Sequence, residues 1–464
     1  MPATPLLPPD HPDRASLAAE VHARPPEPLS APSRASYVAV RIDAEARAAE
    51  LAHIEALCRV TGVAPPPAGG TQWAANLGAL RFKWERHGEF SSYTFFTAGL
   101  SSQPFAEPVA AMLPPGWLAG VPGHTVFAAH AKLAAAALLV DAAVDAAAGP
   151  SGAPSAEQLA AHFGSNVVVG AGIGDGAGMA FTDFVIHPDG FARFLLLDRD
   201  MTARQAGRML QRLFEIEAYR MMALLALPVA RGLWPRLQAI ERTLAELTAR
   251  IAGGAAAQAG GQAAATQDEA LLQQLMALAA EVESALAASQ ARFGASRAYH
   301  ALVATRIGEL REQRIQGLQT IDEFMTRRLN PAMATCATAS GRLHDLSERV
   351  AQASNLLSTR VDIARERQNQ ALLAATARRA KLQLRLQQTV EGLSVAAIVY
   401  YLAGLVGYGA KALKAAGLPL SPDLVTGAAV PVLGLGAWLV LQRVHRRIAA
   451  DDGAHGNDGS RSFH

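Results

Sequence analysis

Two uncharged segments near the C-terminal end constrain this chain more than any other feature. Residues 392–410 and 424–441 contain no Asp, Glu, Lys, Arg or His. At 1.5 Å per residue, a helix of the first length spans roughly 28 Å, close to the thickness of the hydrocarbon core of a bilayer. The pattern predicts two membrane-spanning helices rather than two core helices of a soluble protein.

The two apolar segments are separated by a short connection rich in Gly and Pro, so we expect a transmembrane hairpin over residues 392–442. Basic residues flank it on both outer sides: Arg378, Arg379, Lys381, Arg385, Arg443, Arg446 and Arg447. The connection itself offers only Lys411 and Lys414. Because Lys and Arg favour the cytoplasmic side, we expect both termini, including the tail 443–464, in the cytoplasm.

One face of the first apolar segment combines small residues with hydroxyl groups. The candidate pore or helix-packing residues are Ser394, Ala397, Tyr401, Gly404, Gly407 and Tyr408. Small residues let helices approach closely, and hydroxyl groups could line a hydrated path. The absence of charged residues and histidine from both segments argues against a proton-relay transporter.

The first 200 residues have the pattern of a mixed α/β domain. A helix is expected to end near Val60, and a hairpin turn is expected at His87-Gly88. Roughly seven strands are expected, within residues 37–42, 79–99, 124–130, 166–172, 178–186 and 191–198. Helices between these strands would give residues 1–200 a mixed sheet.

Residues 201–391 are dominated by helix formers and predict a long helical or coiled-coil stalk. We expect Pro228 to interrupt the first helix, residues 253–267 to form a flexible linker, and a second helix to cover 268–329. Asn330-Pro331 would be a turn or the start of a third helix. That helix carries a 3,4-spaced seam of Leu343, Leu346, Val350, Ala353 and Leu357. A bundle within one chain and a seam between chains both remain open.

Altogether the sequence predicts an α+β membrane protein: an N-terminal mixed α/β domain, a long-helix stalk and a C-terminal two-helix transmembrane hairpin. The 42 Lys and Arg nearly balance the 40 Asp and Glu, which gives no electrostatic case for binding nucleic acid. The opening sequence lacks the basic and apolar regions of a secretory signal. Cys58 and Cys336 are far apart and predict neither a disulfide framework nor a zinc site.

Motifs for catalysis are missing. Residues 170–178, GAGIGDGAG, contain a GxGxxA pattern, but a strand-like run follows where a dinucleotide site needs a helix, so we expect a hairpin loop. The patterns HExxH, GxxxxGK[ST] and GxSxG do not occur. We therefore expect no enzyme and no cofactor. His11, Glu20 and His22 could bind a metal, although a docked surface segment is the simpler interpretation, and Glu309-Leu310-Arg311-Glu312 is typical of a charged helix surface.

Several blocks of the sequence resemble the domain-of-unknown-function family 3422, uncharacterised membrane-anchored proteins of bacteria. The blocks lie at 11–40, 215–230, 306–333 and 383–408, and the resemblance covers nearly the whole chain. It implies a location in the bacterial inner membrane and no particular reaction. The order of elements is also similar to that of the pentameric CorA-type magnesium channels, but Gly407-Tyr408-Gly409 stands where those channels have Gly-Met-Asn.

Two functional hypotheses follow. In the first, the protein is a homo-oligomer in the lipid bilayer, has a CorA-like architecture and conducts a cation. A divalent cation is the candidate. In the second, it is a membrane-anchored scaffold that binds cytoplasmic partners and transports nothing.

Overall fold

The structure is a computed structural model that describes residues 8, 10–14, 17–18, 25–103, 105–138, 152–256, 262–415 and 421–455. The chain divides into two compact units. The larger unit comprises residues 1–260 and 270–356, and the smaller comprises 261–269 and 357–464.

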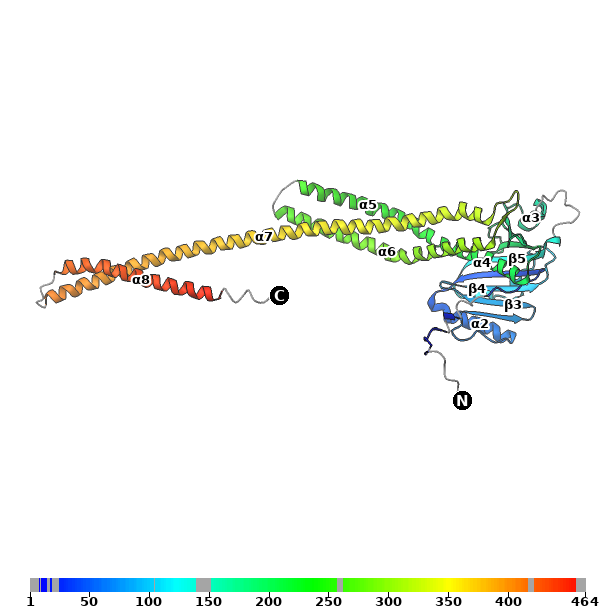
Figure 1. Cartoon of the computed structure of the whole chain (residues 1–464), viewed down its shortest axis with the longest axis horizontal. Coiled ribbons are helices and arrows are strands. Elements are labelled where there is room, and N and C mark those ends of the chain that lie inside the picture. The colour runs from blue at the N-terminus through cyan, green and yellow to red at the C-terminus, as the bar shows by residue number, and fades with distance from the viewer. Residues whose placement is uncertain are drawn as a thin grey trace, which may run out of the picture. The chain divides into compact units, whose positions relative to one another are not determined.

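The larger unit is built around a β-sheet (Figure 1). The sheet has nine strands within the described residues, in the order β2-β3-β4-β1-β5-β8-β7-β6-β9. The strands are β1 Ser33–Arg41, β2 Gln72–Leu77, β3 Leu80–Arg86, β4 Phe90–Ala98, β5 His124–Ala135, β6 Val169–Ile173, β7 Gly178–Thr182, β8 Ala192–Asp198 and β9 Gln313–Arg314. Strands β5 and β8 pair in parallel, and the other neighbours are antiparallel. The expected mixed sheet is confirmed.

The helical segments follow the same chain order. They are α2 Arg47–Thr61, α3 Ala156–Phe163, α4 Ala203–Leu224, α5 Ala226–Ala256, α6 Gln262–Leu310, α7 Ile321–Ala415 and α8 Pro422–His455. Short 3-10 turns are η1 Ala44–Ala46, η2 Val109–Met112, η3 Leu118–Gly120 and η4 Ala136–Leu138.

The sheet buries apolar side chains on both faces because alternate residues of each strand point to opposite sides. On one face Tyr37 of β1 stacks on Phe214 of α4, with ring centroids 4.7 Å apart. On the other face Val38 and Val40 join an aromatic cluster that includes Phe82 and Trp84. Burying each such side chain contributes about 1.5 to 3 kcal/mol, so these two clusters dominate the stability of the larger unit.

Two strand predictions need correction. Strands β2 and β9 were not expected, and β9 is a two-residue strand that pairs with β6 although it follows α6 in the chain. The strand expected over 178–186 ends at Thr182, because the Asp183 carboxylate accepts the amide of Val185 and begins a turn. The hairpins at His87-Gly88 and at residues 170–178 are confirmed.

The boundaries of the long helices also differ from the sequence-based expectation. The break between α4 and α5 at Leu225 lies just before Pro228, whose ring nitrogen cannot donate to the carbonyl of Leu224. The helix expected over 268–329 is wrong, because α6 ends at Leu310 and Arg311 adopts a positive φ of 51°.

Helix α7 begins at Ile321, so Asn330-Pro331 is neither a turn nor a helix start. Its N-terminus is capped twice: Thr320 and Glu323 form reciprocal hydrogen bonds of 3.1 and 3.3 Å, and Glu312 accepts the amides of Ile321 and Asp322. Glu312 is therefore a capping residue, not an exposed helix residue as the sequence indicated.

The α5–α6 connection is shorter than the predicted linker 253–267. Helix α5 reaches Ala256 and α6 begins at Gln262, while residues 257–261 lie outside the described part of the chain.

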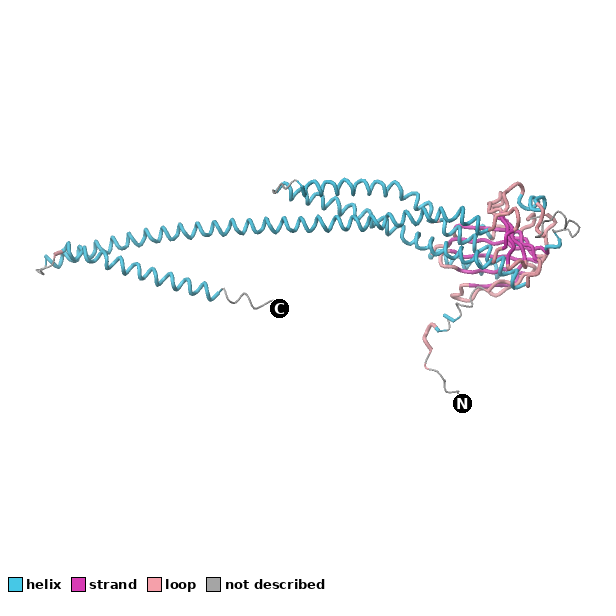
Figure 2. The backbone as a smooth tube through the Cα atoms, turned by 45° about the horizontal axis from the view of Figure 1, so that its top comes forward, coloured by secondary structure: helices cyan, strands magenta, loops and turns pink. Residues whose placement is uncertain are grey.

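The 3,4-spaced seam of α7 packs within the chain. Leu343, Leu346, Val350 and Leu357 are at most 1% exposed. Arg342 of α7 donates to Glu241 of α5 at 3.1 Å, and Ser347 donates to Glu283 of α6 at 2.7 Å. Figures 1 and 2 show these three helices side by side over this stretch. The seam therefore serves an intramolecular bundle up to about Leu357.

Candidate functional site

Two C-terminal helices, α7 and α8, are long and apolar enough to cross a membrane. The apolar windows of these helices bury almost none of their residues within the chain. Large side chains such as Leu393, Tyr401 and Val432 are 69–76% exposed. A surface of this composition is unfavourable in water and needs a partner, either lipid or protein.

Small residues mark the side of α7 that meets α8. Ala403 and Ala410 are buried, and a Cβ added to Gly407 would lie 3.0 Å from Oγ1 of Thr426 in α8. The spacing of three and four residues puts them along one side of the helix. The alanines were missing from the predicted face, although their spacing to Gly407 is the small-residue signal for close helix packing.

The predicted face points elsewhere. Ser394, Ala397, Tyr401, Gly404 and Tyr408 are all exposed, whereas Gly407 turns toward α8. At 100° per residue the centre of this face lies roughly 150° around α7 from Ala403 and Ala410. Within one chain, therefore, α8 leaves the predicted face uncovered.

The hydroxyl group of Ser394 is already engaged. Its Oγ donates to the carbonyl of Val390 at 2.9 Å, a bond within its own helix. Tyr400 and Tyr401 pack their rings edge to face, with centroids 5.8 Å apart. These contacts suit a packing surface better than a hydrated path.

The same side of α7 continues into its polar stretch. Leu372, Leu386 and Val390 lie within roughly 40° of the centre of the predicted face and are 59–68% exposed. The last ion pair between α6 and α7 within the described residues joins Glu269 and Arg365 at 2.8 Å. Beyond it, α7 exposes a leucine-containing stripe that leads directly into the apolar segment. We call the stripe formed by Leu372, Leu386, Val390, Ala397, Tyr401, Gly404 and Tyr408 the open face of α7.

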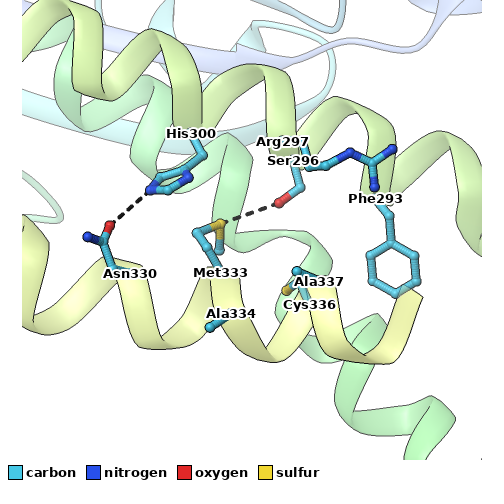
Figure 3. A pocket seen from close by; sticks show the side chains of 9 residues that line it. All are labelled: Phe293, Ser296, Arg297, His300, Asn330, Met333, Ala334, Cys336 and Ala337. Atoms are coloured by element: carbon cyan, nitrogen blue, oxygen red, sulfur yellow. Dashed lines mark hydrogen bonds between the residues drawn. The ribbon is translucent and has the colours of Figure 1, made fainter. Parts of the chain in front are cut away.

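A separate groove of about 300 Å³ lies between α6 and α7 in the larger unit (Figure 3). Phe293, Met333 and Cys336 provide much of its apolar lining. His300 and Asn330 close one end with a hydrogen bond of 2.9 Å. Burial raises the pKa of the Cys336 thiol, so the thiolate needed for nucleophilic chemistry is disfavoured.

A family model described as "Protein of unknown function (DUF3422)" matches residues 9–448. The chain belongs to the DUF3422 family. No curated protein and no solved structure matches the chain. The expected family resemblance is confirmed, whereas the similarity to CorA-type channels has no support.

One buried constellation in the DUF3422 chain resembles a catalytic triad. His130 Nδ1 lies 2.9 Å from Oγ of Ser36, and its Nε2 lies 4.0 Å from a carboxylate oxygen of Asp189. However, Ser36 is fully buried and its Oγ also accepts the amide of Ala110, so no substrate can reach it. Burial lowers the pKa of His130 to about 4, which keeps the imidazole neutral as a core residue.

The described residues of the DUF3422 chain contain no group of three His, Cys, Asp or Glu that could hold a metal ion. Of the N-terminal residues considered for metal binding, His11 is exposed, and Glu20 and His22 lie outside the described residues. The glycine-rich segment 170–178 forms the β6–β7 hairpin, so it does not present a helix N-terminus to a nucleotide phosphate.

Proposed function

We propose that this chain is a non-enzymatic membrane anchor and scaffold, in which α7 and α8 cross the bacterial inner membrane as a hairpin and copies of the chain associate through α7. The uncovered open face of α7 is the observation that carries the proposal. Small residues and tyrosines occupy it where it is apolar, and leucines occupy it where the helix is otherwise polar.

The exposed leucines favour association between copies of the chain over contact with lipid alone. Leu372 and Leu386 belong to a stretch that also contains Arg378, Arg379 and Lys381, so this stretch suits an aqueous or interfacial environment. Lipid would cover Tyr401 and Gly404 but not Leu372. A second copy of α7 would cover the open face along its whole length, and the intramolecular seam at Leu343–Leu357 shows that this sequence supports helix packing with 3,4 spacing.

Of our two hypotheses, the scaffold is better supported than a cation path. The apolar segments carry no charged side chain, and the hydroxyl of Ser394 is bonded to its own helix. A path for divalent cations would need oxygen ligands directed at an axis. The large N-terminal unit, with its sheet and helical bundle, would then serve to bind cytoplasmic partners.

The mass of the detergent-solubilised full chain tests the association. We expect an oligomer for the parent protein and a smaller particle for Leu386→Lys, which places a charge on the open face. Leu384→Lys is the matched control, because Leu384 is also exposed but lies roughly 160° around the helix from Leu386. A monomeric parent, or equal masses for the two variants and the parent, would contradict the proposal. Leakage of Mg²⁺ from proteoliposomes containing the oligomer would favour the cation path instead.

A further inference from the structure

A cavity of about 450 Å³ lies where the β6–β7 turn meets α4 and the C-terminal end of α6 in the larger unit. Its volume is in the range of small-molecule sites. The cavity brings together residues 170–178 and 309–312. The sequence predicted a hairpin loop for the first segment and a charged helix surface for the second. The lining residues that matter are Gly174, Asp175, Arg208, Arg212, Glu309 and Arg311.

Two glycines with positive φ and a backbone hydrogen bond define the β6–β7 turn. Gly174 and Gly176 have φ angles of 63° and 88°, and a Cβ on them would come within 2.9 Å of Gln205 and 2.8 Å of Gln313. The amide of Gly174 donates to the carbonyl of Leu310 at 2.8 Å. The turn is therefore held against the end of α6, and the positive φ angles favour glycine at both positions.

Two charged residues that face each other at the cavity have left-handed backbone conformations. Asp175 has a φ of 61° and Arg311 a φ of 51°. Their side chains form an ion pair with a distance of 2.6 Å. Asp adopts this conformation readily in turns, and a left-handed residue commonly follows a helix end, as Arg311 follows α6. The ion pair therefore joins the β6–β7 turn to the segment after α6 at the edge of the cavity.

Positive charge exceeds negative charge around the cavity. Arg208 is exposed and has no hydrogen-bond or ion-pair partner among the described residues. Arg212 donates to Glu309 at 2.9 Å, but Glu309 also accepts from Arg306 at 3.1 Å. Burial lowers the pKa of Arg212, Glu309 opposes the effect, and repulsion by Arg208 and Arg306 adds to it. Arg306 also pairs with Glu215, which does not line the cavity. Among the lining residues, three arginines thus face two carboxylates, Asp175 and Glu309.

We propose that this cavity binds a small, water-soluble phosphate compound. Guanidinium groups bind phosphate oxygens with paired, charge-assisted hydrogen bonds, and Arg208 and Arg212 lie one turn apart on α4, so both can reach the same anion. Arg311 lines the cavity on the side of the β6–β7 turn. It would release the carboxylate of Asp175 to bind the ligand. The volume exceeds the needs of inorganic phosphate alone, so a phosphomonoester with a small organic group fits best.

The glycine spacing at this site matches a dinucleotide-binding motif, but the surrounding structure is different. The turn between β6 and β7 leads into a strand, so no helix N-terminus contributes amides. Recognition here rests on arginine side chains from α4 and from the segment after α6. The proposal is also independent of membrane insertion and of association through α7, because all these residues belong to the larger unit.

Calorimetric titration of the full chain in phospholipid-free detergent tests the site, with glycerol 3-phosphate and inorganic phosphate as probes and KCl of equal ionic strength as the reference. We expect saturable binding that is tighter for the phosphomonoester. Arg208→Gln should weaken it about tenfold, the loss expected for one charge-assisted contact. Asp175→Asn, which tolerates the left-handed backbone, should tighten it by freeing Arg311.

Arg204→Gln is the matched control, because Arg204 is exposed on the same helix one turn away and does not line the cavity. Retained affinity in that variant, together with the loss in Arg208→Gln, would support a local contact. The absence of saturable binding of both probes would overturn the proposal. Equal weakening by the two arginine variants would also overturn it, since only a general electrostatic effect would then remain.

Discussion

At the scale of single residues, the buried carboxylate of Glu50 shows how a polar group is accommodated beside the sheet. Glu50 is 1% exposed, and its carboxylate accepts hydrogen bonds from Trp84 and Tyr93, both at 2.8 Å. Arg47 lies 3.3 Å from the same carboxylate. A buried charge with every partner in place is structural, and removing one partner of such a group typically costs several kcal/mol.

His130 gives a pH-dependent prediction at this scale. Its pKa is lowered to about 4 by burial, below the value of about 6.5 expected for an unfolded chain. The unfolded state therefore binds the extra proton between these two values, and stability should fall by up to roughly 3 kcal/mol as the pH drops from about 6.5 to 4.

Urea unfolding followed by tryptophan fluorescence at pH 7 and pH 4.5 measures this effect. In His130→Gln the part of the pH dependence caused by His130 should disappear, so the difference between the two pH values should shrink relative to the parent. If parent and variant lose the same stability on acidification, His130 is not responsible and other buried groups, such as His162, are.

At the scale of elements, the sequence predicted what depends on local pattern and missed what depends on tertiary contact. The hairpin at His87-Gly88 and the helix ending near Val60 follow from turn residues and periodicity, and both are present. Strand β9 has only two residues and exists because β6 offers it a free edge, so no local signal marks it. The start of α7 was missed although Thr320 and Glu323 have capping-box spacing, because helix formers continue on both sides.

The candidate site divides in the same way. The composition of the apolar segments predicted the face of α7, whereas the burial of Ala403 and Ala410 depends on the position of α8. The arginine-lined cavity was not predicted, because it joins residues 174–175 to 208–212 and 309–311, which are remote in sequence. The sequence did contain two signals of this cavity, a glycine-rich turn and a charged run. Each signal taken alone has a common structural explanation.

Gly404 tests the role of the open face at this scale. No heavy atom lies within 4 Å of a Cβ built on Gly404, so Gly404→Leu fits within one chain. In a close-packed interface between chains it would cost roughly 1 to 3 kcal/mol by overpacking. We expect a smaller detergent-solubilised particle but unchanged carbonate-resistant membrane retention, since Leu inserts readily.

Gly409→Leu is the control for this comparison. Gly409 is equally free of neighbours within its chain, but it lies roughly 140° around α7 from Gly404. If Gly404→Leu leaves the particle unchanged, the open face contacts lipid, and the interface lies elsewhere.

At the scale of the whole molecule, the two units differ in how much of their apolar surface they bury within the chain. The larger unit buries its apolar side chains by itself, with its sheet covered on both faces. The smaller unit exposes most of its large apolar residues between 372 and 440. The smaller unit therefore needs a lipid or protein partner that the larger unit does not need, and the family model covers both, since it matches residues 9–448.

Membrane topology is the prediction at this scale. Arginines precede α7's apolar segment and follow that of α8, whereas the connection carries Lys411 and Lys414 alone, so both ends should stay in the cytoplasm. A reporter fused at His464 should give a cytoplasmic signal, and one inserted within residues 411–422 should give a periplasmic signal. Two crossings return a chain to the side from which it started, so the residues that precede the apolar segment of α7 should share the side of His464. A cytoplasmic signal from residues 411–422 would show that the hairpin does not cross the bilayer, and the open face of α7 would then have to be covered by protein along its whole length.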